Sequence, residues 1–402
     1  MRTIRLATAV VATAALALPL TVTSATAAPS ADNKTPRHSN AKFERLRWAA
    51  PQGFYVGTAV AGGGHHLEQD YPDPFTHDKP YRKLLAQQFS SVSPENQMKW
   101  EFIHPERDRY DFEAADAIVD FAKRNKQVVR GHTLLWHSQN PEWLEQGDFS
   151  KEELREILHD HITTVVGRYK GKIQQWDVAN EIFDEQGNLR TQDNIWIREL
   201  GPEIIADAFR WAHEADPKAK LFFNDYGVES DNAKSDAYYA LSQELMEQGV
   251  PVHGFSVQAH LSMRYGFPGD LQQNLERFDE LGLETAVTEL DVRMDLPESG
   301  VPTEAQLEQQ ADWYQRTLAA CLAVEDCNSF TIWGFTDKYS WVPVFFEGEG
   351  SATIMTEDFE RKPAYYALHS TLKEAKKNAW KEAWEKAWED WKKDWKKDWR
   401  RH

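Results

Sequence analysis

Two glutamates, Glu181 and Glu289, each stand at the end of a short apolar segment. Two carboxyl groups that face each other can cleave a glycosidic bond, because one protonates the leaving oxygen while the other attacks the anomeric carbon or activates water. A single glutamate at the end of a strand more often forms a salt bridge or caps a helix. The hypothesis of bond cleavage therefore depends on the residues around the pair.

Polar and aromatic side chains also follow the other predicted strands. Along the chain these residues are Glu95, Asn96, Lys99, His132, Trp136, Asn180, Asn224, Asp225, Tyr226, Gln258, His260, Asp291, Trp333, Asp337 and Trp341. In a barrel of parallel strands, catalytic side chains lie at the carboxyl ends of the strands. A barrel end with only a structural role does not need carboxylates, imidazoles, amides and indoles from so many strands. The set predicts an active site at that end.

The elements that would position these residues are eight apolar segments with the length of buried strands. They cover residues 54–57, 89–92, 127–130, 175–178, 221–224, 255–258, 286–289 and 330–333. Helical patterns lie between most of them, for example over 151–169, 202–215 and 305–322. This alternation, with the length of a βα unit between strand starts, predicts an α/β fold, the (β/α)₈ TIM barrel. An open doubly wound sheet is the alternative, but Gly62-Gly63-Gly64 opens a loop and not a phosphate-binding helix.

Composition narrows the class of protein. The chain has 402 residues, 41% hydrophobic and 27% charged, which fits neither a wholly disordered chain nor a membrane protein with many spans. The formal net charge of −18 repels nucleic acid and anionic membranes. The 16 Trp, 13 Tyr and 20 Phe form an aromatic excess of the kind that sugar-binding clefts use. Core packing and the C-terminal tail account for most of these rings.

The N-terminus has the charged, apolar and small-residue order of a secretory signal peptide. Arg2 and Arg5 precede an apolar run over 6–20, and small residues ending in Ala25-Thr26-Ala27 follow it. We expect residues 1–28 to be removed, residues 29–41 to form a leader, and the mature protein to be secreted. Outside the cell a disulfide is permitted, and the two cysteines of the chain, at 321 and 327, either form one across a short loop or stay free.

The tail, residues 373–402, contains neither Gly nor Pro. Its tryptophans recur at intervals of 4, 4, 3, 4 and 4, at Trp380, Trp384, Trp388, Trp391, Trp395 and Trp399. This spacing predicts a helix with a Trp stripe on one face, a larger apolar surface than monomers usually expose. We expect the stripe to be covered by a second copy of the helix, by the barrel, or by a membrane or cell-wall surface. Self-association or surface attachment is the expected function of the tail.

A long loop over 61–75 follows the first predicted strand and contains His65, His66, Asp70 and Asp73. The spacing of these residues fits no standard metal-ligand pattern, so we expect neither a metal nor a cofactor. We expect the loop to shape one end of the substrate cleft.

Four segments together carry the pattern of a known family. They are Gly131-His132-Thr133-Leu134-Leu135-Trp136-His137, Trp176-Asp177-Val178-Ala179-Asn180-Glu181, Thr288-Glu289-Leu290-Asp291 and Trp333-Gly334-Phe335-Thr336-Asp337-Lys338-Tyr339-Ser340-Trp341. The sequence resembles the secreted bacterial endo-1,4-β-xylanases of glycoside hydrolase family ten over roughly residues 42–372. The resemblance implies a (β/α)₈ barrel, a retaining mechanism, and xylan or xylo-oligosaccharide as the partner.

The resemblance also implies a role for each site residue. Glu289 would be the nucleophile, supported by His260 and Asp291, and Glu181 the acid/base, supported by Gln258. The substrate-binding residues would be Glu95, Asn96, Lys99, His132, Trp136, Asn180, Tyr226, Trp333 and Trp341. Cys321 and Cys327 match a short disulfide of the family.

General acid–base chemistry agrees with this assignment. A donor such as His260 keeps the nucleophile ionised, while the negative charge of Glu289 raises the proton affinity of Glu181. Once a glycosyl–enzyme forms, that charge is gone and Glu181 can act as the base. Such a cycle predicts a carboxyl separation of about 5–5.5 Å and retention of the β anomer.

Two other activities stay open on the sequence. A β-1,4-glucanase would differ in the subsite around Lys99, Trp333 and Trp341, which would have to admit the hydroxymethyl group of glucose. A non-catalytic carbohydrate-binding barrel would keep the aromatic residues but lose a carboxylate, whereas both Glu181 and Glu289 are present.

Overall fold

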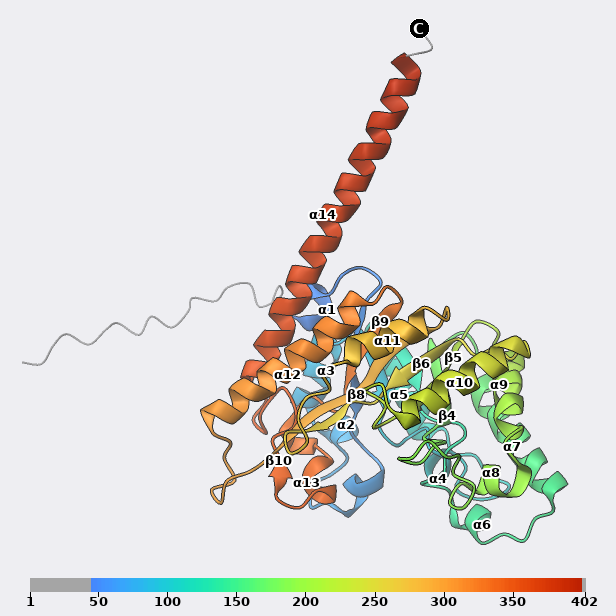
Figure 1. The fold of residues 1–402 in the computed structure, drawn as a ribbon. Coiled ribbons are helices and arrows are strands. Elements are labelled where there is room, and N and C mark those ends of the chain that lie inside the picture. Colours follow the sequence, from blue (N-terminus) through green and yellow to red (C-terminus); the bar gives the residue numbers. More distant parts are fainter. Residues whose placement is uncertain (1–44, 400–402) are drawn as a thin grey trace, which may run out of the picture. The chain divides into compact units, whose positions relative to one another are not determined.

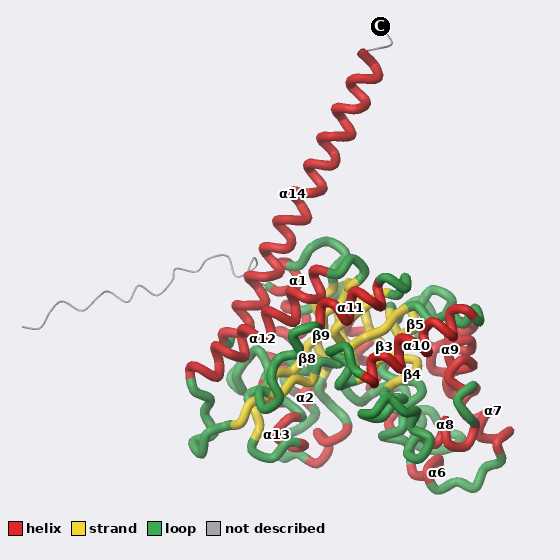
Figure 2. Tube along the Cα trace, viewed as in Figure 1, coloured by secondary structure: helices red, strands yellow, loops and turns green. Residues whose placement is uncertain are grey.

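A computed structural model describes residues 45–399, and side chains up to residue 393. Eight parallel strands form a closed barrel: β1 (Tyr55–Val60), β2 (Ser91–Pro94), β3 (Val128–Gly131), β4 (Gln175–Asn180), β5 (Lys220–Asp225), β6 (Gly254–Val257), β8 (Glu284–Asp295) and β9 (Cys327–Ile332). Each pairs with its neighbour, and β1 pairs with β9 to close the ring. The predicted (β/α)₈ fold is confirmed, and each predicted strand overlaps an observed one. Figure 2 shows the strands inside and the helices around them.

One strand is much longer than the others. β8 runs for 12 residues and continues past the barrel, where it pairs in parallel with β7 (His260–Ser262) and antiparallel with β10 (Glu349–Gly350). The β7 pairing sets His260 opposite Asp291. This extension therefore fixes the two residues that were predicted to support Glu289.

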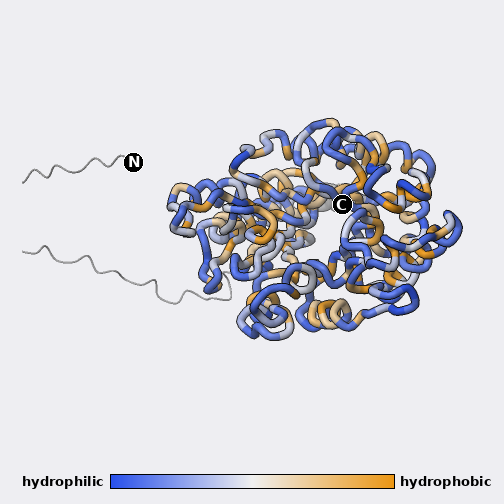
Figure 3. The backbone as a smooth tube through the Cα atoms, turned by 90° about the horizontal axis from the view of Figure 1, so that it is seen from below, coloured by the Kyte–Doolittle hydropathy of each residue, from blue (hydrophilic) through white to orange (hydrophobic). Residues whose placement is uncertain are grey.

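The helices alternate with the strands (Figure 1). Those that carry four or more residues are α1 (Leu46–Ala49), α2 (Pro74–His77), α3 (Lys79–Gln88), α4 (Trp100–Ile103), α5 (Glu113–Arg124), α6 (Glu142–Glu145), α7 (Lys151–Arg168), α8 (Ile195–Leu200), α9 (Ile204–Ala215), α10 (Ala233–Glu247), α11 (Leu271–Asp279), α12 (Glu304–Ala323), α13 (Val342–Phe345) and α14 (Pro363–Trp399), together with the 3-10 turn η1 (Gly64–Glu68); a shorter turn, η2, covers Asp337–Tyr339. Apolar and polar residues alternate along them in Figure 3, as expected of helices with one buried face. Capping boxes begin two of the long ones, at Ser150 with Glu153 and at Thr303 with Gln306.

Two large buried rings pack against the barrel strands, and two glycines make room for them. A Cβ atom at Gly131 would lie 2.2 Å from the Trp176 ring, and one at Gly254 would lie 2.3 Å from the Phe222 ring. Both rings are fully buried. Because nothing larger than glycine fits beside them, these two positions set the spacing of neighbouring strands.

The disulfide implied by the family resemblance is confirmed. Cys321 near the end of α12 and Cys327 at the start of β9 are bonded, with their Cα atoms 5.3 Å apart. The bond joins the last barrel strand to the helix before it.

α14 is one continuous helix across the predicted boundary between barrel and tail at residues 372 and 373. It packs on α12 and α1, and the side chains of Tyr365, Leu368 and Leu372 in its first turns are buried. Beyond them the side chains are exposed, including four tryptophans: Trp380, Trp384, Trp388 and Trp391. Among the residues that the structure describes, no helix is both long and apolar enough to cross a membrane. The predicted signal peptide and leader lie outside the described residues.

Candidate active site

A cleft of about 1430 Å³ lies at the carboxyl ends of the strands. Twelve of the fourteen predicted site residues line it: Glu95, Asn96, Lys99, His132, Trp136, Glu181, Tyr226, Gln258, His260, Glu289, Trp333 and Trp341. The other two, Asn180 and Asp291, are fully buried and hydrogen-bond to residues that line the cleft. The predicted residues therefore converge on one site.

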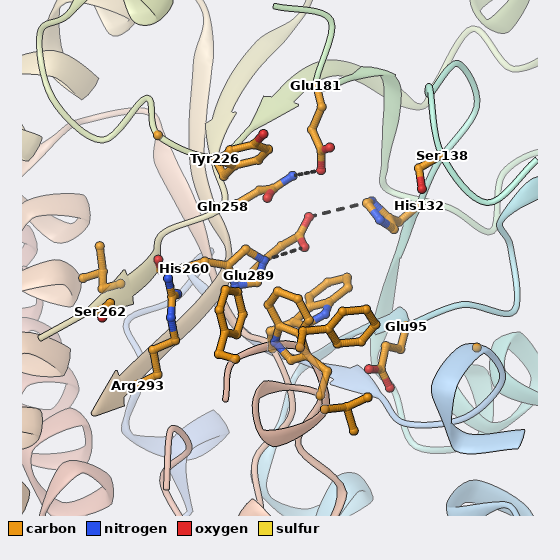
Figure 4. A pocket seen from close by; sticks show the side chains of 18 of the residues that line it. Glu95, His132, Ser138, Glu181, Tyr226, Gln258, His260, Ser262, Glu289 and Arg293 are labelled. Atoms are coloured by element: carbon orange, nitrogen blue, oxygen red, sulfur yellow. Dashed lines mark hydrogen bonds and ion pairs between the residues drawn. The ribbon is translucent and has the colours of Figure 1, made fainter. Parts of the chain in front are cut away.

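Glu289 lies within β8 and is surrounded by donors (Figure 4). Asn224 Nδ2 donates to its Oε1 at 2.8 Å, and His260 Nε2 lies 3.3 Å from its Oε2. His132 Nδ1 is 3.9 Å from Oε1 on the other side. With 4% of its surface exposed, this carboxylate has exchanged water for protein donors almost completely.

These donors decide the ionisation state of Glu289. Burial alone would raise the pKa of its carboxyl group, but the charge of His132 and the hydrogen bonds from His260 and Asn224 outweigh burial and lower the pKa to about 2. Burial would likewise lower the pKa of His260, yet Asp291 and Glu289 raise it to about 10. At neutral pH, an ionised Glu289 therefore faces a protonated His260.

Glu181 directly follows β4, and three neutral donors hold its carboxyl group. Trp136 Nε1 donates to Oε2 at 2.8 Å, while Gln258 Nε2 and Asn180 Nδ2 donate to Oε1 at 2.9 and 3.2 Å. His137 Nδ1 lies 3.8 Å from Oε2, and burial lowers the pKa of that imidazole, which keeps the ring neutral at neutral pH. The Glu181 backbone has a φ of 53°, in the left-handed region that costs a non-glycine residue about 1 kcal/mol or more.

A short chain of amides connects the two carboxyl groups. Asn224 Nδ2 donates both to Glu289 and, at 2.8 Å, to Asn180 Oδ1. Asn180 in turn donates to Glu181, and Thr288 Oγ1 donates to Asn224 Oδ1. The two glutamates are thus oriented by one shared and fully buried framework.

A second polar network occupies the end of the cleft next to η1. Lys99 Nζ donates to Asn96 Oδ1 at 3.1 Å and to Gln139 Oε1 at 2.7 Å. Glu95 Oε2 lies 2.7 Å from His66 Nε2. Burial would raise the pKa of Glu95, but His66 lowers it below the ordinary value, so this wall of the cleft carries a carboxylate.

Aromatic rings border the site on two sides. Trp341 Nε1 donates to Asp291 Oδ2 at 2.9 Å, and its ring lies 4.8 Å from that of His260. The Trp333 ring lies edge-on to His132 at 5.4 Å. Opposite them, Lys234 Nζ lies 3.7 Å from the centre of the Tyr226 ring. These flat walls suit a chain of sugar rings.

Three residues with roles in the site went without a role in the sequence analysis. Asp177 Oδ2 lies 2.9 Å from His132 Nδ1 and is also paired with Arg130. Gln139 joins Lys99 to Asn96, and Asn224 joins the two glutamates. Asn224 was recognised at the end of a strand, and Asp177 lies inside a quoted segment. Gln139 had no signal beyond its place in the loop after β3.

The sequence pattern of glycosyl hydrolase family 10 matches residues 46–371. The chain belongs to glycosyl hydrolase family 10. It is a glycoside hydrolase with the fold of that family, as the resemblance implied.

Relatives and solved structures of family 10 agree with this assignment. Endo-1,4-β-xylanase B of Thermotoga neapolitana is 45% identical over 294 residues, which are 73% of this chain and 84% of the relative. An endo-1,4-β-xylanase of Agaricus bisporus is 39% identical over 77% of this chain and 92% of its own length. The crystal structure of xylanase 10B from Thermotoga maritima superposes with a TM-score of 0.77 at 42% identity, over 83% of this chain and 99% of that one. Xylanase 10B of Thermotoga petrophila, solved in complex with xylobiose, gives a TM-score of 0.76 at 42% identity, over 82% and 97% of the two chains.

Proposed function

We propose that this family 10 enzyme is a secreted endo-1,4-β-xylanase that cleaves the backbone of xylan with retention of the β anomer. The observation that carries the proposal is the pair of glutamates. Glu289 is ionised and held by a protonated imidazole, while Glu181 is held by neutral donors across the same cleft. A retaining glycosidase needs one ionised carboxylate as nucleophile and a second carboxyl group as acid.

In the first step, a Glu289 oxygen attacks the anomeric carbon of the sugar and forms a glycosyl–enzyme ester. The bond from that carbon to the leaving oxygen breaks, and the carboxyl proton of Glu181 moves to this oxygen. Glu289 loses its negative charge as the ester forms. The attraction between Glu289 and the imidazolium of His260 therefore weakens along this step.

In the second step, Glu181 is a carboxylate and takes a proton from water. The resulting hydroxide attacks the anomeric carbon, and the ester bond to Glu289 breaks. Glu289 carries no charge in the intermediate, so an ionised Glu181 no longer faces a second carboxylate when it acts as the base. Two inversions at one carbon leave the product in the β configuration.

Support for xylan as substrate comes from the relatives and from the walls of the cleft. Relatives of this chain carry the name endo-1,4-β-xylanase, and solved family members hold xylobiose or xylopentaose. In this chain, Lys99, Trp333 and Trp341 line the cleft, and we expect them to border the extra hydroxymethyl group of glucose. A β-1,4-glucanase is the second candidate.

The test is the release of reducing ends from β-1,4-xylan and from a soluble β-1,4-glucan by the mature chain. We expect xylan to be cleaved far faster, with the β anomer as the first product seen by NMR. Glu289→Ala should abolish cleavage, and azide should then yield an α-glycosyl azide because a small anion replaces the missing nucleophile. Glu298→Gln, on the exposed loop after β8, is the matched control and should cleave as the unsubstituted chain does. Equal rates on both polymers would overturn the substrate, and an α anomer as first product would overturn the mechanism.

Secretion is the part of the proposal that rests on the N-terminus alone. Expression in a secreting bacterial host should release a protein whose N-terminal sequence begins near residue 29. Retention of residues 1–28 in a purely cytoplasmic product would contradict it.

For the tail, we propose that a second copy of the chain covers the tryptophans of α14. Trp380, Trp384, Trp388 and Trp391 are 74%, 59%, 44% and 55% exposed, so the barrel does not cover them. The rings of Trp384, Trp388 and Trp391 stack on one another, with centroids 5.9 and 5.0 Å apart. A stacked row of rings is a continuous apolar ridge of a kind that drives helix pairing.

The sequence around the ridge favours a partner helix of the same kind. The tryptophans repeat with a period of eleven residues, which lets two helices pack along the stripe with a right-handed supercoil. By helical spacing, Asp390 lies on one side of the stripe, and Lys381, Glu385 and Lys392 lie on the other. In a parallel pair, opposite sides of the stripe face each other, so Asp390 meets the side that carries Lys381 and Lys392.

Sedimentation analysis of the mature chain tests this pairing. We expect a dimer for the full chain and a monomer after Trp384→Ala with Trp388→Ala, with xylan cleavage unchanged in both. The matched control is Lys377→Ala with Lys381→Ala, which keeps the ridge. Self-association would be overturned if the full chain were a monomer at every concentration. It would also be overturned if the unsubstituted chain, but not the double tryptophan variant, bound neutral lipid vesicles.

A further inference from the structure

A cluster of three metal-ligating side chains lies at one end of the cleft, away from the two catalytic glutamates. It consists of His65 and His66 in η1 and Glu95 just after β2. One nitrogen of each imidazole and one oxygen of the carboxylate lie within 4.8 Å of one another. Ligands of a tetrahedral zinc ion lie roughly 3.5 Å apart, given metal–ligand bonds of about 2.0–2.2 Å. Side-chain shifts of about 1 Å, which separate the closest pair and bring the more distant atoms nearer, would give such a set.

The imidazole of His66 is already oriented as a ligand. Its Nε2 faces Glu95 Oε2 at 2.7 Å, and its Nδ1 lies 2.8 Å from the hydroxyl oxygen of Tyr71. Metal-binding histidines usually form a hydrogen bond through the nitrogen that does not bind the metal, and this bond fixes the ring and its tautomer. Tyr71 supplies that bond here. Both His66 and Glu95 are buried, which limits other orientations.

His65 provides the observation that no other contact explains. Its Nε2 is shielded from solvent and has no hydrogen-bond partner among the described residues. Its ring lies 3.9 Å from the ring of His66. An unsatisfied buried nitrogen is costly, and a metal ion would remove that cost by accepting its lone pair. His65 also lines the cleft, so the fourth position on the metal would face solvent.

We propose that His65, His66 and Glu95 form a binding site for a divalent transition-metal ion, with Zn²⁺ as the probe. Two imidazole nitrogens and one carboxylate oxygen are a ligand set that zinc uses when it leaves a fourth position open. The ion takes the place of the hydrogen atom between His66 and Glu95. A calcium or magnesium ion would not suit the site, because both prefer oxygen ligands.

The site competes with the sugar. Glu95 is among the residues expected to bind xylan, and a Glu95 oxygen that is bound to zinc cannot accept a hydrogen bond from a sugar hydroxyl. Zinc should therefore inhibit xylan cleavage competitively; this consequence, unlike the binding itself, rests on the proposed function.

Calorimetric titration of the metal-free mature chain with Zn²⁺ tests the binding without any substrate. We expect one ion per chain with a dissociation constant in the micromolar range. His65→Ala should weaken binding by more than tenfold, and Tyr71→Phe by about tenfold, since loss of a supporting hydrogen bond typically costs 10–100-fold in affinity. The matched control is His159→Ala, an exposed histidine on α7 that should leave this binding event unchanged. Four-coordinate Co²⁺ in the same site should give a strong visible absorption band that His65→Ala removes.

A second measurement joins the metal to the cleft. Xylobiose should raise the apparent dissociation constant of Zn²⁺ for the unsubstituted chain. In the absence of zinc, the circular dichroism spectrum and the thermal midpoint of His65→Ala should match those of the unsubstituted chain, which demonstrates that the variant folds. No zinc binding, or binding that His65→Ala leaves unchanged, overturns the site. Binding at this site without competition overturns the inhibition alone.

Discussion

The two glutamates of the cleft, Glu181 and Glu289, have identical side chains but different surroundings. Each accepts protein hydrogen bonds, so the presence of donors does not distinguish them. The charge of the donors does: Glu289 faces the protonated His260, whereas Glu181 accepts from an indole and two amides. A cation stabilises a carboxylate far more than a neutral donor of equal geometry does. Roles in a carboxyl pair are therefore read from the charge of the donors and not from their number.

The largest expected effect comes from removing the nucleophile. Glu289→Gln keeps the size of the side chain but cannot form the ester, and we expect kcat on xylan to fall by on the order of 10⁵-fold. The measurement is the release of reducing ends over hours at high enzyme concentration. A loss of less than tenfold would mean that Glu289 is not the nucleophile.

Removal of the acid should have a smaller effect that depends on the leaving group. Glu181→Ala should lower kcat on xylan by about 10²–10⁴-fold, the usual contribution of general acid catalysis. On an aryl xylobioside with an acidic phenol, the first step needs no proton, so a burst of phenol should precede slow turnover. Equal losses on the two substrates would contradict the role of Glu181 as acid/base.

The donor charge itself can be removed. His260→Asn leaves a neutral donor near Glu289, so the pKa of Glu289 should rise from about 2 toward its ordinary value. Its depressed pKa contributes stability above the unfolded-state pKa that is lost as pH falls through the folded-state pKa of about 2. In the variant, this stability should be lost at a higher pH. The acid limb of the kcat/KM profile should also lie at a higher pH. An acid limb that stays in place would separate His260 from the nucleophile.

The smallest effect is expected at Asp291, which contacts His260 and not Glu289 itself. Asp291→Asn removes the main cause of the raised His260 pKa, so the imidazole should titrate well below the value of about 10 in the unsubstituted chain. The charge of His260 contributes stability below its unfolded-state pKa, and this stability is lost as pH rises through the folded-state pKa. NMR titration of the His260 ring measures the shift directly. An unchanged midpoint would mean that Glu289 alone holds the proton on His260.

The barrel and the placement of Glu181 and Glu289 in one cleft could be predicted because their signals are local in sequence. Buried strands read as short apolar runs, and the residues at their ends share one edge by topology. The role of Asn224 could not be predicted, because it depends on the register between β4, β5 and β8. The proposed metal site has the same limit: the spacing of His65 and His66 alone predicts no metal, because the third member of the cluster, Glu95, follows another strand.

α14 is a long helix that continues well beyond the barrel. The helix has 37 residues, and a rise of about 1.5 Å per residue makes it about 55 Å long. Its first turns are fixed to α12 and α1, so there is no hinge of Gly or Pro between the barrel and the tryptophans. The helix acts as a lever arm: whatever holds its far end also sets the direction in which the cleft points. Two chains joined through this helix would hold their two clefts at a fixed relative orientation.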